Sequence, residues 1–145
     1  EAVTAGVLVR MSGQMNGIML SCQQLEFVNL VLESMLGLTV RDYEELDELG
    51  KSTLVEVGNI AISTFINALA GLSGISVDLT VPAFAVDMQG AILAVPMAEY
   101  GGMSDYLMTI GGNFVCEGKQ VPCRLLLSPD IRSLNFLMKK LGVAE

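Results

Sequence analysis

A carboxylate and an amide stand at the start of a strongly apolar stretch of this sequence. No charged residue occurs from Val57 to Val77, yet Glu56 comes directly before this stretch and Asn59 lies three residues further on. Residues three apart share one face of a helix, where such a pair can donate and accept hydrogen bonds and orient a water molecule. The pair contains no nucleophile and no metal-binding set. If the pair takes part in catalysis, the reactive group must therefore come from elsewhere.

The polar positions continue in both directions along the expected helix. At about 100° per residue, an arc of about 80° contains Ser52, Glu56, Asn59, Ser63 and Asn67. Glu45, two turns before Ser52, is expected on the same line. Apolar side chains cover the rest of the helix, which predicts burial on most sides. This pattern has two interpretations: a binding line, or only the solvated edge of a core helix.

Gly58 interrupts this helix directly beside the polar pair. A glycine costs a helix about 1 kcal/mol relative to alanine. We therefore expect another part of the molecule to approach the backbone closely at this position.

The residue types of the whole chain exclude several kinds of active site. There is no histidine, which excludes Ser-His and Cys-His nucleophile pairs and any histidine-bound metal. The three cysteines, Cys22, Cys116 and Cys123, lack C-x-x-C spacing, which favours reduced thiols in a cytoplasmic protein. Cys22 lies at the start of an expected helix, where the pKa of a thiol can be lowered, but there is no histidine to use it.

The net charge and the uncharged run narrow the choice of partners. Sixteen acidic against eight basic residues give a net charge of -8, which disfavours a nucleic-acid partner. The uncharged stretch from Val57 to Val77 is long enough to cross a bilayer. However, it contains several polar side chains and glycines, and its charged neighbours are Glu56 and Asp78 rather than basic or aromatic anchors. We therefore expect no membrane segment.

Periodicity and turn residues predict one α+β domain, a two-layer α/β arrangement in which long helices pack on an antiparallel sheet. The expected strands span 5–13, 16–22, 75–81 (ending before Pro82), 104–118 and 119–128, with a hairpin turn over Glu117-Gly118. The expected helices span 23–37, 42–72, 85–101 (disturbed by Pro96) and 129–142.

Two segments of the chain resemble each other. "GIMLSCQQLEFVNLVLESMLG" and "CRLLLSPDIRSLNFLMKKLG" both contain an apolar strand ending in Leu-Ser, then a helix with a central Asn and a Leu-Gly end. The similarity is either a coincidence between two strand-helix units or an internal duplication. On the second interpretation, 42–145 is a complete second half-repeat. Residues 1–37 are then the remainder of a first half-repeat whose opening helix is expected upstream of Glu1.

The order Ser52-x-x-x-Glu56-x-x-Asn59, followed after twenty-two residues by Pro82, resembles the signature of the CheC/CheX/FliY family of chemotaxis phosphatases. The surrounding residues, "DELGKSTLVEVGNIAISTFINALAGLSGISVDLTVPAFAVDMQGAIL", are most similar to CheC. The resemblance implies a pseudo-two-fold fold whose first half is incomplete here. It also implies that the N-terminal segment of the family is lacking here. Because that would leave part of the sheet or core exposed, we expect that the chain can pair with a second copy as a homodimer.

The resemblance further implies a function and a partner. The substrate would be the aspartyl phosphate of the response regulator CheY, which supplies its own Mg²⁺, so that no cofactor is bound by this chain. Asn59 would hold the attacking water and Glu56 would contact a lysine of the regulator. Ser52, Gly58 and Pro82 would be motif or partner-binding residues, with Pro82 in a shaping role. The alternative is a non-catalytic interaction module, either a CheD-binding adaptor or a flagellar-switch component.

A second Glu-x-x-Asn pair, Glu26 and Asn29, does not complete the pattern. Cys22 stands at its first position, and Ser52 rather than a proline stands at the matching distance. We therefore expect Asn29 to have a packing role and not a catalytic one.

Overall fold

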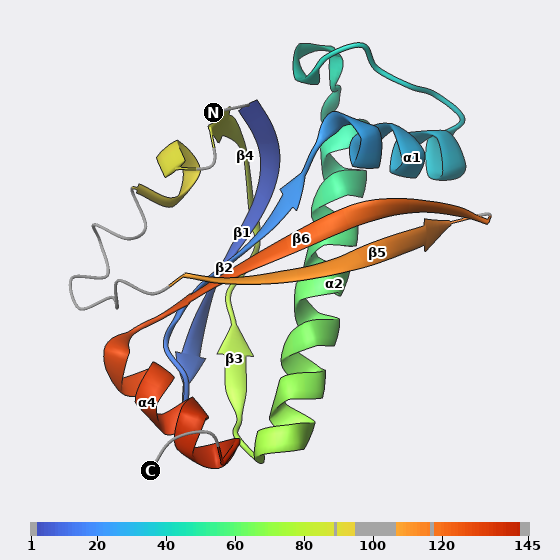
Figure 1. Cartoon of the computed structure of the whole chain (residues 1–145). Helices are drawn as coiled ribbons and strands as arrows, with labels where there is room; N and C mark the ends of the chain where they lie inside the picture. Colours follow the sequence, from blue (N-terminus) through green and yellow to red (C-terminus); the bar gives the residue numbers. More distant parts are fainter. Residues whose placement is uncertain (1–2, 89, 95–106, 117, 143–145) are drawn as a thin grey trace.

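The computed structural model describes residues 3–88, 90–94, 107–116 and 118–142, and within them one antiparallel sheet carries the helices (Figure 1). The strand order is β3-β1-β2-β6-β5, and β4 pairs with β1. The strands are β1 Val3–Gly13, β2 Gly17–Gln23, β3 Val77–Leu79, β4 Ala83–Met88, β5 Met108–Cys116 and β6 Lys119–Pro129. The helices are α1 Leu25–Leu36, the 3-10 turn η1 Tyr43–Glu45, α2 Glu48–Ser73 and α4 Ile131–Lys140; residues 90–94 are also helical. The predicted α+β class is therefore confirmed.

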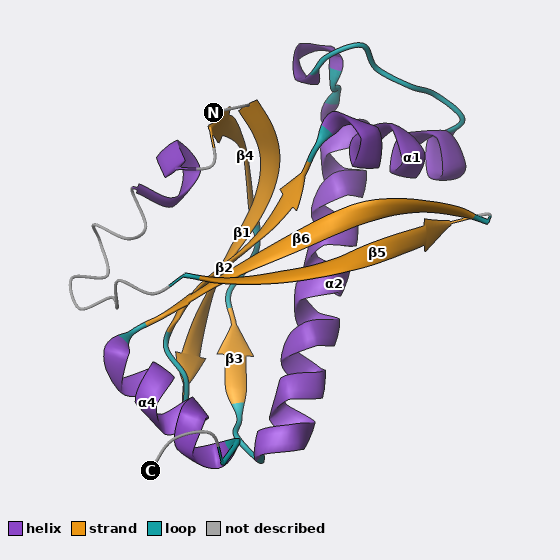
Figure 2. Cartoon of the chain, viewed as in Figure 1, coloured by secondary structure: helices purple, strands orange, loops and turns teal. Residues whose placement is uncertain are grey.

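Side chains alternate between the two faces of the sheet, and each face has its own core. Val9 and Met19 lie in a cluster with Ile62 and Ile66 of α2, so α2 covers this face. Leu20 lies in a different cluster with Ile92, so residues 90–94 pack on the opposite face. Figure 2 shows α2 running the length of the sheet, with α1 near one end and α4 near the other. The central strand β2 is buried along its whole length.

The two segments that resemble each other in sequence lie side by side in the centre of the sheet. Their strands, β2 and β6, pair antiparallel, with Met19 opposite Leu127 and Leu20 opposite Leu126. When the two segments are aligned on their Leu-Ser ends, Met19 corresponds to Leu126 and Leu20 corresponds to Leu127. The pairing is therefore symmetric, because exchanging the two strands turns the Met19–Leu127 pair into the Leu20–Leu126 pair. An internal duplication would produce such a register. The division into half-repeats stays a prediction.

The long helix α2 begins later than expected, at Glu48. Asp47 is its N-cap, since its side chain accepts a hydrogen bond from the backbone N–H of Gly50 at 2.7 Å. Asp42 accepts in the same way from Glu44 N–H and starts the separate turn η1. Aspartates that bond nearby backbone N–H groups favour caps and turns over helix interiors. The predicted helix start at Asp42 is therefore wrong.

The same break removes Glu45 from the predicted polar line. Its carboxylate accepts from the backbone N–H of Arg41 at 2.6 Å and from the Arg41 guanidinium at 2.9 and 3.0 Å. Glu45 belongs to the turn before α2 and not to the face that carries Glu56.

α2 has the length and apolar character of a candidate membrane span, with a mean hydropathy of 1.4 over its most apolar 18 residues. In this structure α2 packs on the sheet, and the side chains of its residues Leu54 and Ile62 are fully buried in the core. Only 33% of its most apolar stretch is buried, so the predicted burial of this helix on most sides is wrong. The expected absence of a membrane segment stays a prediction.

The predicted helix over 85–101 is wrong at its start, because Ala83–Met88 form the strand β4 along β1. The backbone pairing offered by the edge of β1 overrides the helix propensity of this Ala- and Met-containing segment. Residues 90–94 are helical, whereas Pro96 lies outside the described residues.

The C-terminal elements agree more closely with the prediction. β5 and β6 form the expected antiparallel hairpin, with Gly118 at a φ of 81°, and Glu117 lies outside the described residues. Pro129 ends β6 rather than opening the last helix. Asp130 caps α4 by accepting from Ser133 N–H at 2.7 Å.

Candidate functional site

α2 presents its polar residues on the side that faces away from the sheet. Ser52 and Glu56 are exposed and Asn59 is half-buried, while Val57 and Gly58 between them are buried. The alternation follows from the helical period, since the opposite side of the same turns packs on the sheet. The expected close approach at Gly58 is confirmed, because its backbone lies against Val7 of β1.

A broken edge strand brings Pro82 to this side of α2. β3 pairs with Met11 to Gly13 and β4 pairs with Val3 to Leu8, so both lie along the same edge of β1. Between them, Thr80 N–H donates to Arg10 O at 3.0 Å, and Thr80 Oγ1 accepts from Arg10 N–H at 2.9 Å. Pro82 has no N–H to donate to the ladder, so it fits a position where strand pairing is interrupted.

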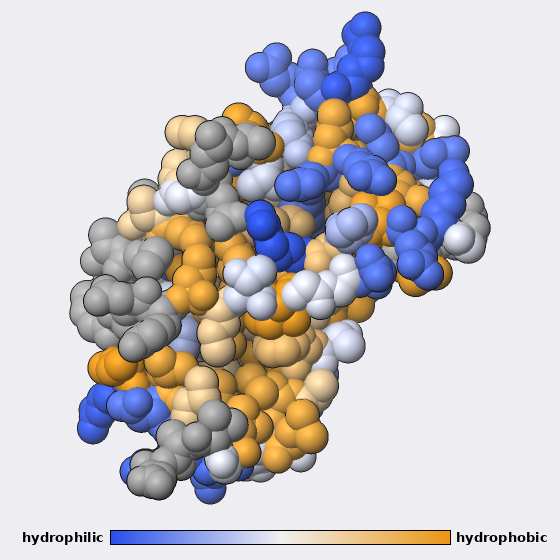
Figure 3. Space-filling model, viewed as in Figure 1, coloured by the Kyte–Doolittle hydropathy of each residue, from blue (hydrophilic) through white to orange (hydrophobic). Residues whose placement is uncertain are grey.

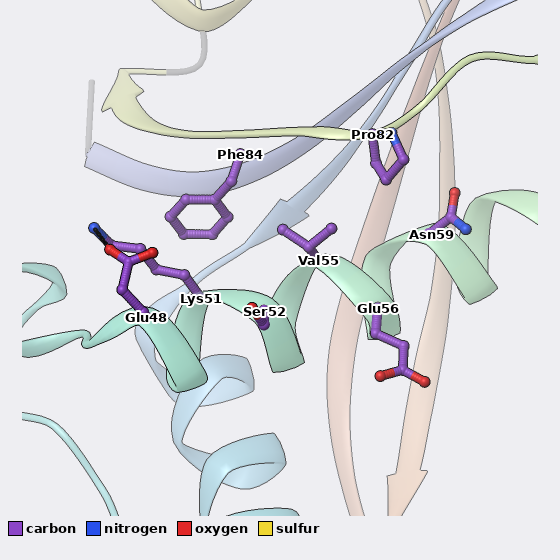
Figure 4. A pocket seen from close by; sticks show the side chains of 8 residues that line it. All are labelled: Glu48, Lys51, Ser52, Val55, Glu56, Asn59, Pro82 and Phe84. Carbon is purple, nitrogen blue, oxygen red and sulfur yellow. Dashed lines mark ion pairs between the residues drawn. The ribbon is translucent and has the colours of Figure 1, made fainter.

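A surface hollow of about 510 Å³ joins the helix and this edge. Its lining residues are Glu48, Lys51, Ser52, Val55, Glu56, Asn59, Pro82 and Phe84 (Figure 4). Four of the five predicted site residues thus come together, and the fifth, Gly58, lies beneath them against the sheet.

Figure 4 shows that Glu56 and Asn59 are directed differently. The Asn59 amide lies on the side of α2 that faces Pro82, while the Glu56 carboxylate points away from Pro82. Within the described residues, the side chains of Ser52, Glu56 and Asn59 make no hydrogen bond or ion pair. The amide and the carboxylate are therefore available to contact two different groups of a bound molecule.

Asn29 of the second Glu-x-x-Asn pair is engaged within the protein. Its Nδ2 donates to Val40 O at 2.9 Å, and its Oδ1 accepts from Val40 N–H at 2.8 Å. These bonds tie α1 to the connection that leads to η1. The expected packing role of Asn29 is confirmed.

Sequence reasoning missed four lining residues, which are Glu48, Lys51, Val55 and Phe84. Lys51 is the single basic residue between Arg41 and Lys119 and directly precedes Ser52, which is a signal that the sequence offered. Its ammonium group lies 3.9 Å from the Glu48 carboxylate, at the limit of an ion pair, and both side chains reach solvent. Such a pair contributes little to stability. Lys51 therefore remains free to contact an acidic partner.

Lys51 and Phe84 also line a second hollow, of about 500 Å³, beside the first. Tyr43 and Leu46 form its far side, so the two hollows follow one another along the N-terminal part of α2. Burial raises the pKa of the Tyr43 hydroxyl, which stays protonated and can donate. Figure 3 shows hydrophilic residues gathered at this end of the molecule and hydrophobic ones toward the other end of α2.

The thiols described by the structure are not activated. Within the described residues neither Cys22 nor Cys123 forms a disulfide, and burial raises the pKa of each thiol. The lowered pKa considered for Cys22 is therefore wrong, because desolvation outweighs its position before a helix. Among residues 3–88, 90–94, 107–116 and 118–142, no three metal-binding side chains come together.

Comparison with known sequences connects this site with a family. Residues 49–86, which include every predicted site residue, match the model of a family described as CheC-like. The chain is 24% identical to the CheY-P phosphatase CheC of Bacillus subtilis (strain 168) over 148 aligned positions, 99% of this chain and 71% of that protein. The resemblance to the CheC/CheX/FliY family is confirmed.

Solved structures share the fold at low sequence identity. FliY of Thermotoga maritima has a TM-score of 0.69 at 17% identity, covering 100% of this chain and 73% of its own. The CheX-CheY-BeF3-Mg²⁺ complex of Borrelia burgdorferi contains a chain with a TM-score of 0.57 at 20% identity, covering 87% and 75%. A CheC-like superfamily protein from Shewanella sp. PV-4 has a TM-score of 0.55 at 18% identity, covering 88% and 73%.

Proposed function

We propose that this chain, whose CheC-like segment carries Ser52, Glu56 and Asn59, is a phosphatase that hydrolyses the aspartyl phosphate of a CheY-type response regulator. The observation that carries the proposal is the hollow that these three residues line together with Pro82, and their side chains make no other interaction in the described protein. The match to a CheY-P phosphatase and the fold shared with a chain of a CheX-CheY complex support a regulator as the partner.

We assign to Asn59 the role of holding the attacking water molecule. Its amide oxygen would accept a hydrogen bond from a water molecule held in line with the bond between phosphorus and the aspartyl oxygen. The water attacks phosphorus, the aspartate leaves as a free carboxylate, and inorganic phosphate and a proton are released. Holding the water in line lowers the barrier by positioning, without a nucleophile from this chain. This fits a site with an amide and no histidine, cysteine or metal set.

We assign to Glu56 the role of docking the chain to the regulator. Its exposed carboxylate points away from Pro82, where it can form a charge-assisted hydrogen bond with a lysine of the regulator. The regulator would also supply the Mg²⁺ that neutralises the phosphoryl oxygens. Ser52 and Pro82 would complete the contact surface. Gly58, on the buried side of α2, would let this turn of the helix lie close to the sheet.

The test is phosphate release from a regulator loaded with Mg²⁺ and a phosphodonor, with the wild-type chain and with the double variant Glu56→Ala/Asn59→Ala. We expect acceleration by the wild type and none by the variant. The control is Asn29→Ala, which removes an equivalent amide outside the hollow and should keep its activity per folded molecule. Equal release with and without the folded wild-type chain would refute the proposal.

The same variants separate the proposal from a non-catalytic interaction module. A CheD-binding adaptor or switch component would bind its partner equally well with and without Glu56 and Asn59, and would not accelerate phosphate release. A cytoplasmic location goes with the phosphatase proposal, since thiols that form no disulfide, such as those of Cys22 and Cys123, are typical of a reducing compartment. Binding of CheD and self-pairing stay predictions.

A further inference from the structure

A fully buried glutamine lies under the turn of α2 that carries the polar pair. Gln23 is the last residue of β2, and its side chain is 0% exposed. Its Nε2 donates to the backbone carbonyl of Leu54 at 3.0 Å. In an α-helix the same carbonyl accepts from the N–H four residues on, which is that of Gly58. Gln23 is thus bonded to the helix within the turn that holds Glu56.

Gly58 makes room for this bond. A Cβ at position 58 would lie 3.1 Å from Nε2 of Gln23, closer than side chains normally pack. The glycine therefore lets the helix lie close to the sheet where the glutamine reaches the carbonyl of Leu54. Gln23 and Gly58 together set the distance between this turn of α2 and the strands β1 and β2.

Packing alone does not account for an amide at this place. Within the described residues, Oε1 of Gln23 has no hydrogen-bond partner. A buried acceptor without a partner destabilises the folded state, and an apolar side chain of similar length would fill the space without that penalty. A hydrogen bond, unlike an apolar contact, is directional and fixes how the helix is rotated on the sheet.

Gln23 also holds the segment before α2. Its backbone carbonyl accepts from the hydroxyl of Tyr43 at 3.2 Å. Tyr43 belongs to η1 and lines the second hollow, while Leu54 belongs to α2. One residue of the central sheet is therefore bonded to two of the elements that line the hollows, η1 and α2.

We propose that Gln23 is a positioning residue for the site: through the carbonyl of Leu54, it fixes the orientation of the turn that presents Glu56 and Asn59. It touches no substrate, because it lies on the buried side of the helix. The activity readout of this inference rests on the proposed phosphatase function, whereas its structural readout rests on the geometry alone.

The decisive variant is Gln23→Met, which keeps the length and bulk of the side chain but cannot donate. We expect an unfolding midpoint equal to or above that of the wild type, because the unpaired Oε1 is removed. We expect kcat for phosphate release to fall roughly tenfold, because small displacements of a positioning group cost much of its effect. A lowered midpoint with an unchanged kcat would overturn the proposal and leave Gln23 a merely structural residue.

A matched control separates positioning from stability. Ile66→Val removes one buried methylene group from the same helix, two turns beyond Asn59. It should lower the unfolding midpoint without changing kcat. An equal loss of kcat in this variant would mean that any weakening of the helix impairs activity, and the proposal would fail.

Backbone amide NMR gives a readout that needs no activity. Gln23→Met should shift the resonances of residues 54–60 while those of α4 stay in place. Unchanged resonances at 54–60 would refute the positioning role. If the wild-type chain fails to dephosphorylate any regulator, the proposed function fails, and the NMR result still decides the role of Gln23.

Discussion

Gly58 of α2 and Val7 of β1 lie so close that no side chain fits between them. A Cβ at position 58 would come within 2.7 Å of Val7 Cγ2 and 2.8 Å of Val7 Cβ. Real Cβ atoms essentially never approach other atoms so closely, so any larger residue must displace the helix or the strand. This contact sets the distance between the sheet and the turn that carries Glu56 and Asn59.

The first prediction concerns this contact. Gly58→Ala gains about 1 kcal/mol of helix propensity but forces overpacking that costs typically about 1–3 kcal/mol. We expect a net loss of stability in urea unfolding and a lower kcat, because the polar pair is displaced.

The control for that prediction lies on the same helix. If Gly71 carried a Cβ, no described atom would lie within 4 Å of it. Gly71→Ala should therefore raise the free energy of unfolding by about 1 kcal/mol. A stabilised and fully active Gly58→Ala variant would contradict the importance of the close approach.

The second prediction contrasts the two Glu-x-x-Asn pairs. Asn29→Ala leaves both backbone groups of Val40 without their partner and should cost about 1–3 kcal/mol of stability, with activity per folded molecule retained. Asn59→Ala should change stability by no more than about 0.5 kcal/mol, because the side chain makes no bond within the described protein, and should abolish activity. Thermal unfolding and phosphate release measure both; the reverse result would exchange the roles of the two asparagines.

The third prediction concerns the charge of Glu56. Glu56→Gln keeps the shape of the side chain but loses a charge-assisted contact, so we expect KM for the phosphorylated regulator to rise about tenfold or more at low salt. The rise should shrink as salt screens the charge. Glu33→Gln on α1 removes the same charge from an exposed site outside the hollow and should leave KM unchanged. An equal effect of both variants would indicate only long-range attraction.

The fourth prediction concerns acid pH. The backbone N–H and the guanidinium of Arg41 lower the pKa of Glu45 below its ordinary value of 4.5. A carboxyl group with a lowered pKa in the folded state stabilises that state above its ordinary pKa, and the effect is lost as the pH falls through the folded value. The difference in unfolding midpoint between wild type and Glu45→Gln should therefore be constant near neutral pH and shrink in acid. A difference that persists in acid would contradict the assignment.

The sequence by itself determined the class of the fold and the candidate residues of the site. Ser52, Glu56 and Asn59 fall on one face because an α-helix has a fixed period, whereas Pro82 was identified through the resemblance to the family signature. The same local rules identified the apolar strands and the helix end at Gly37, where the glycine adopts a positive φ angle. Such features depend on neighbours along the chain, so they can be read without the tertiary structure.

The tertiary structure alone decided how these residues are supported. β4 became a strand because β1 offered an edge, and the late start of α2 at Glu48 followed from two capping aspartates that the charge pattern had presented as helical. The amide of Gln23 under Leu54 and the engagement of Asn29 by Val40 join residues far apart in the chain or across a turn. Long-range pairing and burial override local preference, and no residue spacing records them.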